Sequence, residues 1–342
     1  MEFSWLRTSA EWQELAEGWD GLFKRSITQV PFLSYGYLST WWETMGGGEW
    51  PAEKSELAVI IAREDGALAG IAPLFISSKA DSPRALRFIG SIEVSDYLDL
   101  IVSKAELDAF CAGLLAYLQS QAELKDLPLI LDNILDSSPS LVALTRAAEA
   151  AGYTAVEEVL QPSPYIPLAG SFDDWLAGID KKQRHEIRRK LRNAAANYEL
   201  NYYNKHDHQN CKEEMLAFLN MMRTEHAKDL FLNPKMEEFM QGAALNACRE
   251  GRLVLSFLEL DGVKAAAYLS FKNGKALLVY NSAFEPEYFS ASPGWVLLAM
   301  LIEWAIEQGF EEVDMMRGDE VYKYRFGGVN RYVKRLRLDP PA

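Results

Sequence analysis

Residues 252–280 read RLVLSFLELDGVKAAAYLSFKNGKALLVY. Two dipeptides interrupt the apolar runs, Asp261-Gly262 and Asn273-Gly274, and both are typical of two-residue β-hairpin turns. The spacing predicts a three-stranded antiparallel meander. Patterns of amphipathic helices precede and follow it along the chain, so the sequence indicates an α/β or α+β fold class.

The first half of the chain repeats this order. At an offset of 196, Asp65-Gly66 aligns with Asp261-Gly262, and each pair lies between two apolar runs. At an offset of 191, RALRFIGS (84–91) aligns with KALLVYNS (275–282). The shared order of elements predicts a duplicated domain.

A helix and then a short strand are expected after each aligned block, and the strands lead to Asp132 and Asp314, respectively. Between the halves lies the proline-rich segment QPSPYIP (Gln161–Pro167), which is typical of a linker. The sequence therefore predicts two domains, residues 1–165 and residues 166–342.

The chain of 342 residues has a formal net charge of −14, yet KKQRHEIRRKLR (Lys181–Arg192) holds seven basic residues and one acid. The overall charge disfavours DNA as a partner. The basic segment is a candidate for an anionic ligand. It also fits an amphipathic helix capped by Asp180, with Ile187 and Leu191 inward and the arginines in solvent.

The three cysteines are far apart and odd in number, which predicts neither a disulfide framework nor a zinc site. His206 and His208 have no third ligand at a suitable spacing, so we expect no metal. The most apolar stretch, Trp295–Ile302, is far shorter than the roughly 20 residues of a membrane span. With no apolar signal-peptide core either, we expect a cytoplasmic protein without a membrane span.

Two segments of the second half could carry chemistry. Ser292-Pro293-Gly294 is a suitable start for the apolar helix that follows, and such a start can bind phosphate or be an ordinary cap. Further on, a predicted strand at Glu311–Met316 leads into the charged segment Arg317–Gly327, which contains two tyrosines. That loop could hold catalytic groups with altered pKa values, or be a salt-bridged turn.

In the first half, Glu93–Asp99 is acidic and aromatic, which suits a cationic amine or a polar turn. The GxSxG, GxGxxG and P-loop patterns do not occur in the sequence. Their absence argues against serine hydrolases, Rossmann dinucleotide enzymes and P-loop nucleotide hydrolases.

Four stretches together resemble the Fem-type, or CelD/BioF-like, branch of the GNAT acyltransferases, over roughly residues 30–330. They are IGSIEVSDYLDLIV (89–102), KKQRHEIRRKLR (181–192), YNSAFEPEYFSASPGWVLLAMLIEWAIEQG (280–309) and VDMMRGDEVYKYRFG (313–327). The resemblance implies two tandem GNAT-like domains, each a mixed β-sheet flanked by helices. Acyl transfer is expected in the C-terminal domain.

The same resemblance implies a donor site for acetyl-coenzyme A or another acyl-coenzyme A, used as co-substrate, with no permanent cofactor. The helix start at Ser292, Gly294 and Trp295 replaces the usual Gln/Arg-x-x-Gly-x-Gly/Ala loop and would hold the pyrophosphate. A splayed strand at Tyr280 and Asn281 would offer a backbone amide to the thioester carbonyl.

By the same likeness, Glu320 or Asp319 would be the base that accepts the amine proton, and Tyr322, or else Tyr324, would protonate the leaving thiolate. Two further cations, Arg317 and Lys323, would hold phosphate or a substrate carboxylate. In the first domain, an acceptor site is expected at Asp96, Tyr97 and Asp99, unless that domain is only a scaffold.

These expectations describe an acyl-coenzyme A-dependent N-acyltransferase that modifies an amine of a small molecule or of an envelope or polysaccharide precursor. A Fem-type transferase that takes its acyl group from charged tRNA is an alternative, with the basic helix as the RNA contact. A non-catalytic GNAT-like module in polysaccharide or envelope assembly is another.

Overall fold

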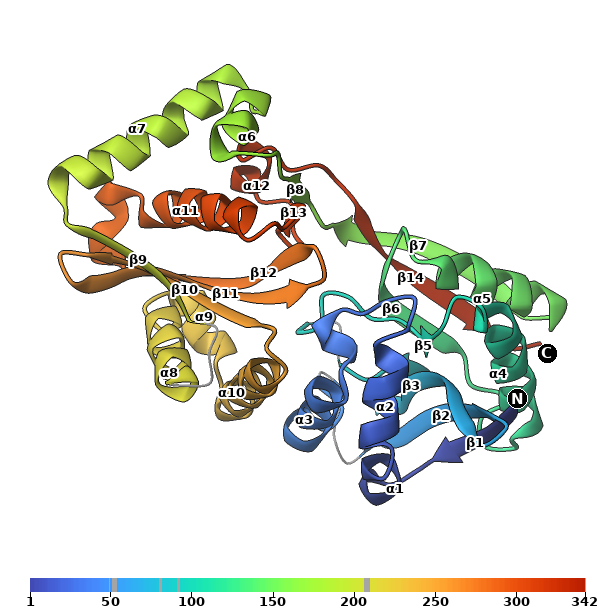
Figure 1. The fold of residues 1–342 in the computed structure, drawn as a ribbon. Coiled ribbons are helices and arrows are strands. Elements are labelled where there is room, and N and C mark those ends of the chain that lie inside the picture. The colour runs from blue at the N-terminus through green and yellow to red at the C-terminus, as the bar shows by residue number, and fades with distance from the viewer. Residues whose placement is uncertain (49, 51–53, 80–81, 91–92, 206–209, 342) are drawn as a thin grey trace. The chain divides into compact units, whose positions relative to one another are not determined.

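The computed structural model describes residues 1–48, 50, 54–79, 82–90, 93–205 and 210–341. The chain divides into two compact units: unit 1 is Met1–Gln161 with Arg331–Ala342, and unit 2 is Pro162–Asn330. Each unit is a mixed sheet with helices on both sides, which confirms the predicted α/β class (Figure 1).

Unit 1 is built on an eight-stranded sheet in the order β1-β2-β3-β4-β6-β14-β7, with β5 paired to β3. The pairs β1–β2, β2–β3, β3–β4, β3–β5 and β6–β14 are antiparallel, whereas β4 and β6 are parallel. The strands are β1 (Glu2–Leu6), β2 (Glu56–Glu64), β3 (Ala67–Lys79), β4 (Ser82–Phe88), β5 (Ile101–Val102), β6 (Leu129–Leu135), β7 (Thr154–Pro162) and β14 (Tyr332–Asp339).

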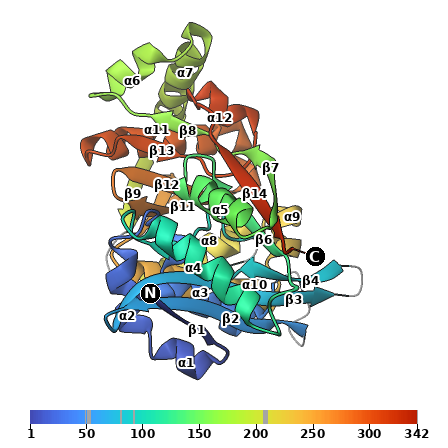
Figure 2. The ribbon, with the colours of Figure 1, turned by 90° about the vertical axis from the view of Figure 1, so that its right-hand side faces the viewer.

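Helices cover both faces of this sheet. Two of them pack side by side on one face, α4 (Leu107–Ser120) and α5 (Pro139–Ala150), as the second view shows (Figure 2). On the other side lie α1 (Ser9–Gln13), α2 (Ala16–Phe23), η1 (Pro31–Leu33) and α3 (Tyr35–Met45). The contact of α4 with the sheet is close, because the ring of Phe110 occupies the space where a side chain at Gly70 would begin.

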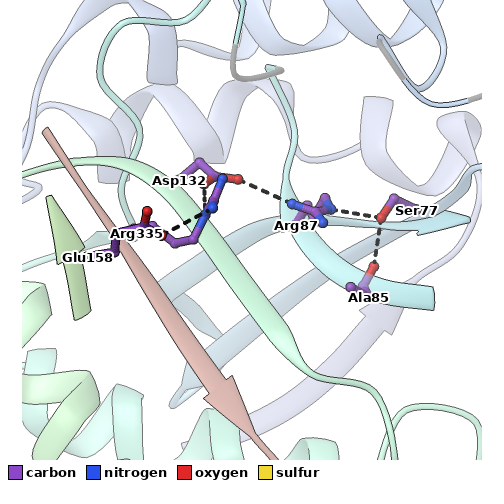
Figure 3. Close-up of polar contacts among 6 residues, drawn as sticks. All are labelled: Ser77, Ala85, Arg87, Asp132, Glu158 and Arg335. Atoms are coloured by element: carbon purple, nitrogen blue, oxygen red, sulfur yellow. Dashed lines mark hydrogen bonds and ion pairs between the residues drawn. The ribbon is translucent and has the colours of Figure 1, made fainter. Parts of the chain in front are cut away.

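Charged side chains form a ladder across four neighbouring strands of this sheet (Figure 3). Arg87 on β4 donates to Asp132 on β6 over 3.2 Å, and Arg335 on β14 donates to the same carboxylate over 2.5 Å. Arg335 also pairs with Glu158 on β7 at 3.3 Å. Arg87 and Asp132 are buried, so the ladder links the C-terminal strand β14 to the core of unit 1.

Unit 2 has a six-stranded sheet in the order β8-β13-β12-β11-β10-β9. The strands are β8 (Tyr165–Pro167), β9 (Leu200–Lys205), β10 (Leu253–Leu260), β11 (Val263–Asn273), β12 (Ala276–Phe284) and β13 (Glu312–Asp314). Strands β10 to β12 are the predicted meander, and both predicted turns are confirmed: Asp261, Gly262 and Gly274 have positive φ angles.

One face of this sheet carries the apolar helix α11 (Pro293–Glu307), crossed by the basic helix α7 (Lys181–Asn197) (Figure 1). Asp180 caps α7 as predicted, because its carboxylate accepts from the amides of Lys182 and Gln183. The remaining helices are α6 (Phe172–Gly178) and α12 (Val321–Arg325) on the α11 side, with η3 (Pro286–Ala291) leading into α11, and α8 (Cys211–Met222), α9 (His226–Phe231) and α10 (Pro234–Arg249) on the opposite face.

The register of the strands supports the predicted repeat. Leu86 pairs with Leu129 in the parallel contact of unit 1, and Leu277 pairs with Val313 in that of unit 2. Leu86 and Leu277 are separated by the offset of 191 seen in the sequence. Each sheet therefore contains one parallel contact in which Leu86 and Leu277 occupy equivalent positions.

Three local expectations differ from the structure. The apolar run Tyr97–Val102 (YLDLIV) predicts a strand, but only Ile101–Val102 forms one. The Asp99 carboxylate within this run instead accepts from Thr28 and Ser140. Ser103 and Glu106 have the spacing of a capping box, which predicts a helix start at Ser103. In the structure the Ser103 hydroxyl donates to the Glu106 carboxylate, and α4 begins at Leu107. Residues 331–342 lie in unit 1, whereas the sequence-based division groups them with the second half. Part of the first repeat block, residues 91–92, falls outside the described residues.

Candidate functional site

A cavity of about 340 Å³ opens in unit 2 where the end of β12 faces the start of α11. Most of its wall is aromatic or aliphatic, and its polar groups come from one lysine, two serines and two tyrosines. The lining residues are Lys190, Tyr268, Ser282, Phe284, Phe289, Ser292, Pro293, Gly294, Trp295, Leu298, Tyr322 and Phe326.

The cavity lies beside the part of β12 that extends beyond its pairing with β13. Their parallel pairing covers only Ala276–Leu278 and Glu312–Asp314, so the second half of β12 continues without β13 beside it. In the same region the register of β12 against β11 shifts between Leu269 and Ser270, which leaves Tyr280 as the extra residue of a β-bulge. The backbone at Tyr280 and Asn281 is therefore irregular, and the role expected of it at the thioester carbonyl stays a prediction.

The side chains of Tyr280 and Asn281 do not line the cavity. The ring of Tyr280 packs against Phe271 with a centroid distance of 5.5 Å. The side-chain oxygen of Asn281 accepts from the amide of Ser282 over 2.8 Å. Any contribution of these two residues to the site therefore comes through the backbone, whereas Ser282 and Phe284 present side chains to the cavity.

At the start of α11, Ser292 adopts a left-handed backbone conformation with φ 54° and ψ 51°. Its carbonyl accepts from the amides of Trp295 and Val296, and Pro293 has no amide proton to offer. Gly294 therefore keeps the one amide of this first turn that is not used by another described residue. A Cβ atom at Gly294 would lie 2.5 Å from the ring of Phe284, so only glycine leaves this corner open.

Lys190 is the one charged residue among the described residues of the cavity wall, and the sequence did not single it out as a site residue. It reaches from α7 so that its Nζ donates to the Ser292 hydroxyl over 2.6 Å and lies 5.0 Å from the centre of the Trp295 ring. Glu186 is 3.6 Å from the same ammonium. The basic run Lys181–Arg192 contains Lys190, next to the inward-facing Leu191. The sequence alone could not show that Lys190 contacts the start of α11.

Two phenols also line the cavity: Tyr268, which is buried, and Tyr322, which is partly buried. Burial raises the pKa of Tyr322, and the negative charge of Glu320 raises it further. Burial also raises the pKa of Tyr268, whose hydroxyl donates to the Gly294 carbonyl over 3.4 Å. Both hydroxyls stay protonated at neutral pH, so Tyr322 can act as a proton donor to a group in the cavity.

In the charged segment Arg317–Gly327, the backbone wraps around the side chain of Lys323. This side chain is 1% exposed, and its ammonium donates to the carbonyls of Met316, Arg317 and Gly318. It also pairs with the Glu320 carboxylate at 2.8 Å. Lys323 therefore points into the loop and away from the cavity, where it holds Glu320 in place.

The other predicted residues of this loop lie nearer solvent. Asp319 and Glu320 are exposed, and Arg317 is half-buried. Tyr324 points elsewhere, because its hydroxyl donates to Asn330 over 2.8 Å. Of the two tyrosines weighed from the sequence, only Tyr322 lines the cavity.

The acceptor residues expected in the first half are buried in unit 1. Asp96, Tyr97 and Asp99 are 8%, 1% and 1% exposed, respectively. The Asp99 carboxylate accepts from the hydroxyls of Thr28, Ser138 and Ser140 at 2.5–2.6 Å and from the amide of Leu100 at 2.8 Å. Burial nevertheless raises the pKa of Asp99. These groups have the surroundings of a structural cluster.

Among the residues that the structure describes, no group of three or more His, Cys, Asp or Glu side chains could hold a metal ion. His206 and His208 lie outside that part of the chain. Within the same part, no helix combines the length and the apolar character needed to cross a bilayer.

Residues 181–324 match the family model described as acetyltransferase (GNAT) domain. Among solved structures, the chain resembles FemX with a TM-score of 0.65 and 13% identity, covering 97% of both chains. A conserved protein of unknown function from Bacteroides thetaiotaomicron gives 0.60 and 13%, covering 99% and 100%.

The C-terminal domain of a putative lysylphosphatidylglycerol synthetase from Agrobacterium fabrum gives a TM-score of 0.58 and 11% identity, covering 95% of this chain and 91% of that one. Because these sequence identities are only 11–13%, the three comparisons show similarity of fold alone. No curated protein matches the sequence. The matched family model contains α7, α11 and all but one residue of the cavity wall, since Phe326 lies just beyond it.

Proposed function

We propose that this chain is an acyl-coenzyme A-dependent N-acyltransferase of the GNAT type, since residues 181–324 match a GNAT acetyltransferase domain and the fold resembles that of FemX. Acetyl-coenzyme A is the simplest donor. The acceptor is an amine of a small molecule or of an envelope or polysaccharide precursor. The observation that carries the proposal is the cavity at the parting of β12 and β13, with the protonated Tyr322 on its wall.

The cavity suits the thioester arm of the donor. Its walls of Phe284, Trp295 and Leu298 offer apolar surface to a pantetheine chain. At its rim, the Lys190 ammonium and the free amide of Gly294 are the groups available to a pyrophosphate. The positive end of the dipole of α11, a helix of 15 residues, favours an anion at the same place.

In the proposed reaction the amine nitrogen attacks the thioester carbonyl, so that a C–N bond forms and the C–S bond breaks. Glu320, or else Asp319, takes the proton that the attacking amine loses, directly or through water. Tyr322 gives its proton to the leaving thiolate and regains one from solvent. A backbone amide of the bulge at Tyr280 and Asn281 would stabilise the negative oxygen of the intermediate.

The packing of the loop gives its cations a different role from the one first expected. Lys323 has its donors occupied by three carbonyls and by Glu320, so we assign it to positioning the base. Arg317 and Lys190 are then the candidates for contact with phosphate. In unit 1, the hydrogen bonds of Asp99 favour a scaffold role over acceptor binding.

Tyr322→Phe tests the proposal, with Tyr324→Phe as the matched control. With acetyl-coenzyme A and an amine substrate, we expect Tyr322→Phe to lower kcat by about 10²-fold, the lower end of the range for general-acid groups, with little change in KM. Tyr324→Phe should keep full turnover. Equal turnover in both variants, or no thermal stabilisation of the wild-type protein by acetyl-coenzyme A, would contradict the proposal.

A second candidate is aminoacyl transfer from charged tRNA. One observation favours it: among the described residues, Lys181, Lys182 and Arg192 of α7 have no ion-pair partner and stay available to a polyanion. Binding of tRNA that weakens steeply with salt, and weakens further in the K181Q/K182Q/R192Q variant, would support this donor. If neither donor binds, the chain is a non-catalytic GNAT-like module.

A further inference from the structure

Unit 2 has a second cavity, of about 430 Å³, between the edge strand β9 and the C-terminal half of α11. It shares no lining residue with the candidate site. Its volume is within the range of small-molecule pockets. The lining residues are Tyr202, Tyr203, Asn204, Met300, Glu303, Trp304 and Glu307.

The floor of this β9–α11 cavity is held by a fixed polar chain. Ser256, which is 0% exposed, donates from its hydroxyl to the side-chain oxygen of Asn204 over 2.6 Å. The amide nitrogen of Asn204 donates in turn to the Tyr202 hydroxyl over 2.8 Å. These bonds orient the Tyr202 ring toward α11, so the cavity has a rigid aromatic floor.

Acidic groups form one side of the cavity. Glu303 and Glu307 are one turn apart on α11, and Trp304 lies next to Glu303. Within the described chain, neither carboxylate forms an ion pair, and no lysine or arginine lines the cavity. Burial raises the pKa of Glu303, and the negative charges of Glu307 and Asp173 raise it further.

We propose that the β9–α11 cavity binds an organic cation, namely a primary amine or a short polyamine. An ammonium between Glu303 and Glu307 would supply the missing positive charge, since carboxylates one helical turn apart have Cβ atoms about 6 Å apart. The ring of Trp304 and the side chain of Met300 would contact the alkyl chain, and the aromatic faces attract a cation directly.

The same features disfavour a metal ion. Two carboxylates are fewer oxygen ligands than Ca²⁺ or Mg²⁺ usually takes from a protein, and the rest of the wall is aromatic or thioether. A cavity of 430 Å³ is also far larger than a single ion requires. The chemistry therefore matches an extended organic cation.

Isothermal titration calorimetry with spermidine and putrescine tests the proposal on the full chain. We expect saturable binding that weakens at least tenfold in the E303Q/E307Q variant. Glu238→Gln is the matched control, because Glu238 is an exposed acid on α10, across the sheet from α11. Trp304→Phe should bind more weakly than wild type but better than Trp304→Ala, provided that circular dichroism shows all variants folded.

Three results would overturn the proposal. The first is no saturable binding of either amine, and the second is an equal loss of binding in Glu238→Gln, which would indicate general attraction to an acidic surface. The third is binding that E303Q/E307Q leaves unchanged, since the amine would then occupy the candidate acyl-transfer site. Because Tyr322→Phe tests that other site, the two proposals can fail separately.

Discussion

The hydroxyl of Tyr322 is the residue-scale feature on which acid catalysis depends. Its pKa is raised in the folded protein above the unfolded value of about 10. The stabilisation linked to its proton is therefore complete below about pH 10 and is lost as the pH rises through the folded-state pKa. We expect wild-type protein to lose more unfolding free energy than Tyr322→Phe between about pH 9 and pH 11.

Urea denaturation at several pH values measures this difference. Tyr332→Phe, which removes a partly exposed hydroxyl in unit 1, controls for the loss of a phenol as such. Parallel curves for wild type and Tyr322→Phe across the alkaline range would show that the phenol is not held in its protonated form by the cavity.

Gly294 keeps the cavity open, also at the scale of one residue. In Gly294→Ala the new methyl group would lie 2.5 Å from the ring of Phe284. We expect a loss of about 1–3 kcal/mol of unfolding free energy from overpacking, and weaker stabilisation by acetyl-coenzyme A. Gly178→Ala is the control, because a Cβ atom at that helical glycine meets nothing within 4 Å. Adding Phe284→Leu to Gly294→Ala should restore part of the lost stability.

At the scale of elements, the ladder of charges in unit 1 supports β14 through its side chains. Arg87→Met removes a buried partner of Asp132, and we expect it to cost about 3 kcal/mol of unfolding free energy. Arg335 is 31% exposed, so Arg335→Met should cost less, about 1–2 kcal/mol. Arg337→Met on the same strand, whose partner is exposed, should stay within about 0.5 kcal/mol of wild type.

Chemical denaturation of the three variants ranks these losses. If Arg337→Met were as destabilising as Arg335→Met, the charge on β14 would matter in general and the contact with Asp132 would not. If Arg87→Met were neutral, the buried pair would contribute nothing that a methionine cannot replace.

The elements that the sequence predicted are those specified by neighbouring residues. The hairpin at Asp261-Gly262 and the cap at Asp180 depend on short-range chemistry, and both were predicted. The orientation of Lys190 and the ladder at Asp132 depend on partners more than 100 residues away. No periodicity in one segment encodes such a partner, so Lys190 was seen as part of a charged run and β14 was grouped with the second half.

The whole molecule contains the same arrangement of strands twice, but the surroundings of the parallel pair differ between the two units. In unit 2 the strands separate around a cavity, whereas in unit 1 the residues after β4 lead to the buried Asp99 and its four hydrogen bonds. The repeat in the sequence predicted the shared fold. It could not predict which copy stays open, because side chains far apart in the chain decide that.

Strand β14 makes the fold of unit 1 depend on the end of the chain. It lies between β6 and β7 in the sheet, so a chain that ends at Asn330 would separate β7 from the sheet and leave β6 paired with β4 alone. Unit 2 contains all six strands of its own sheet within Pro162–Asn330. We expect deletion of residues 331–342 to expose unit 1 to limited proteolysis while unit 2 remains protected and still binds acetyl-coenzyme A. Loss of protection in both units together would mean that unit 2 cannot keep its fold, and with it the acyl-donor cavity, once unit 1 unfolds.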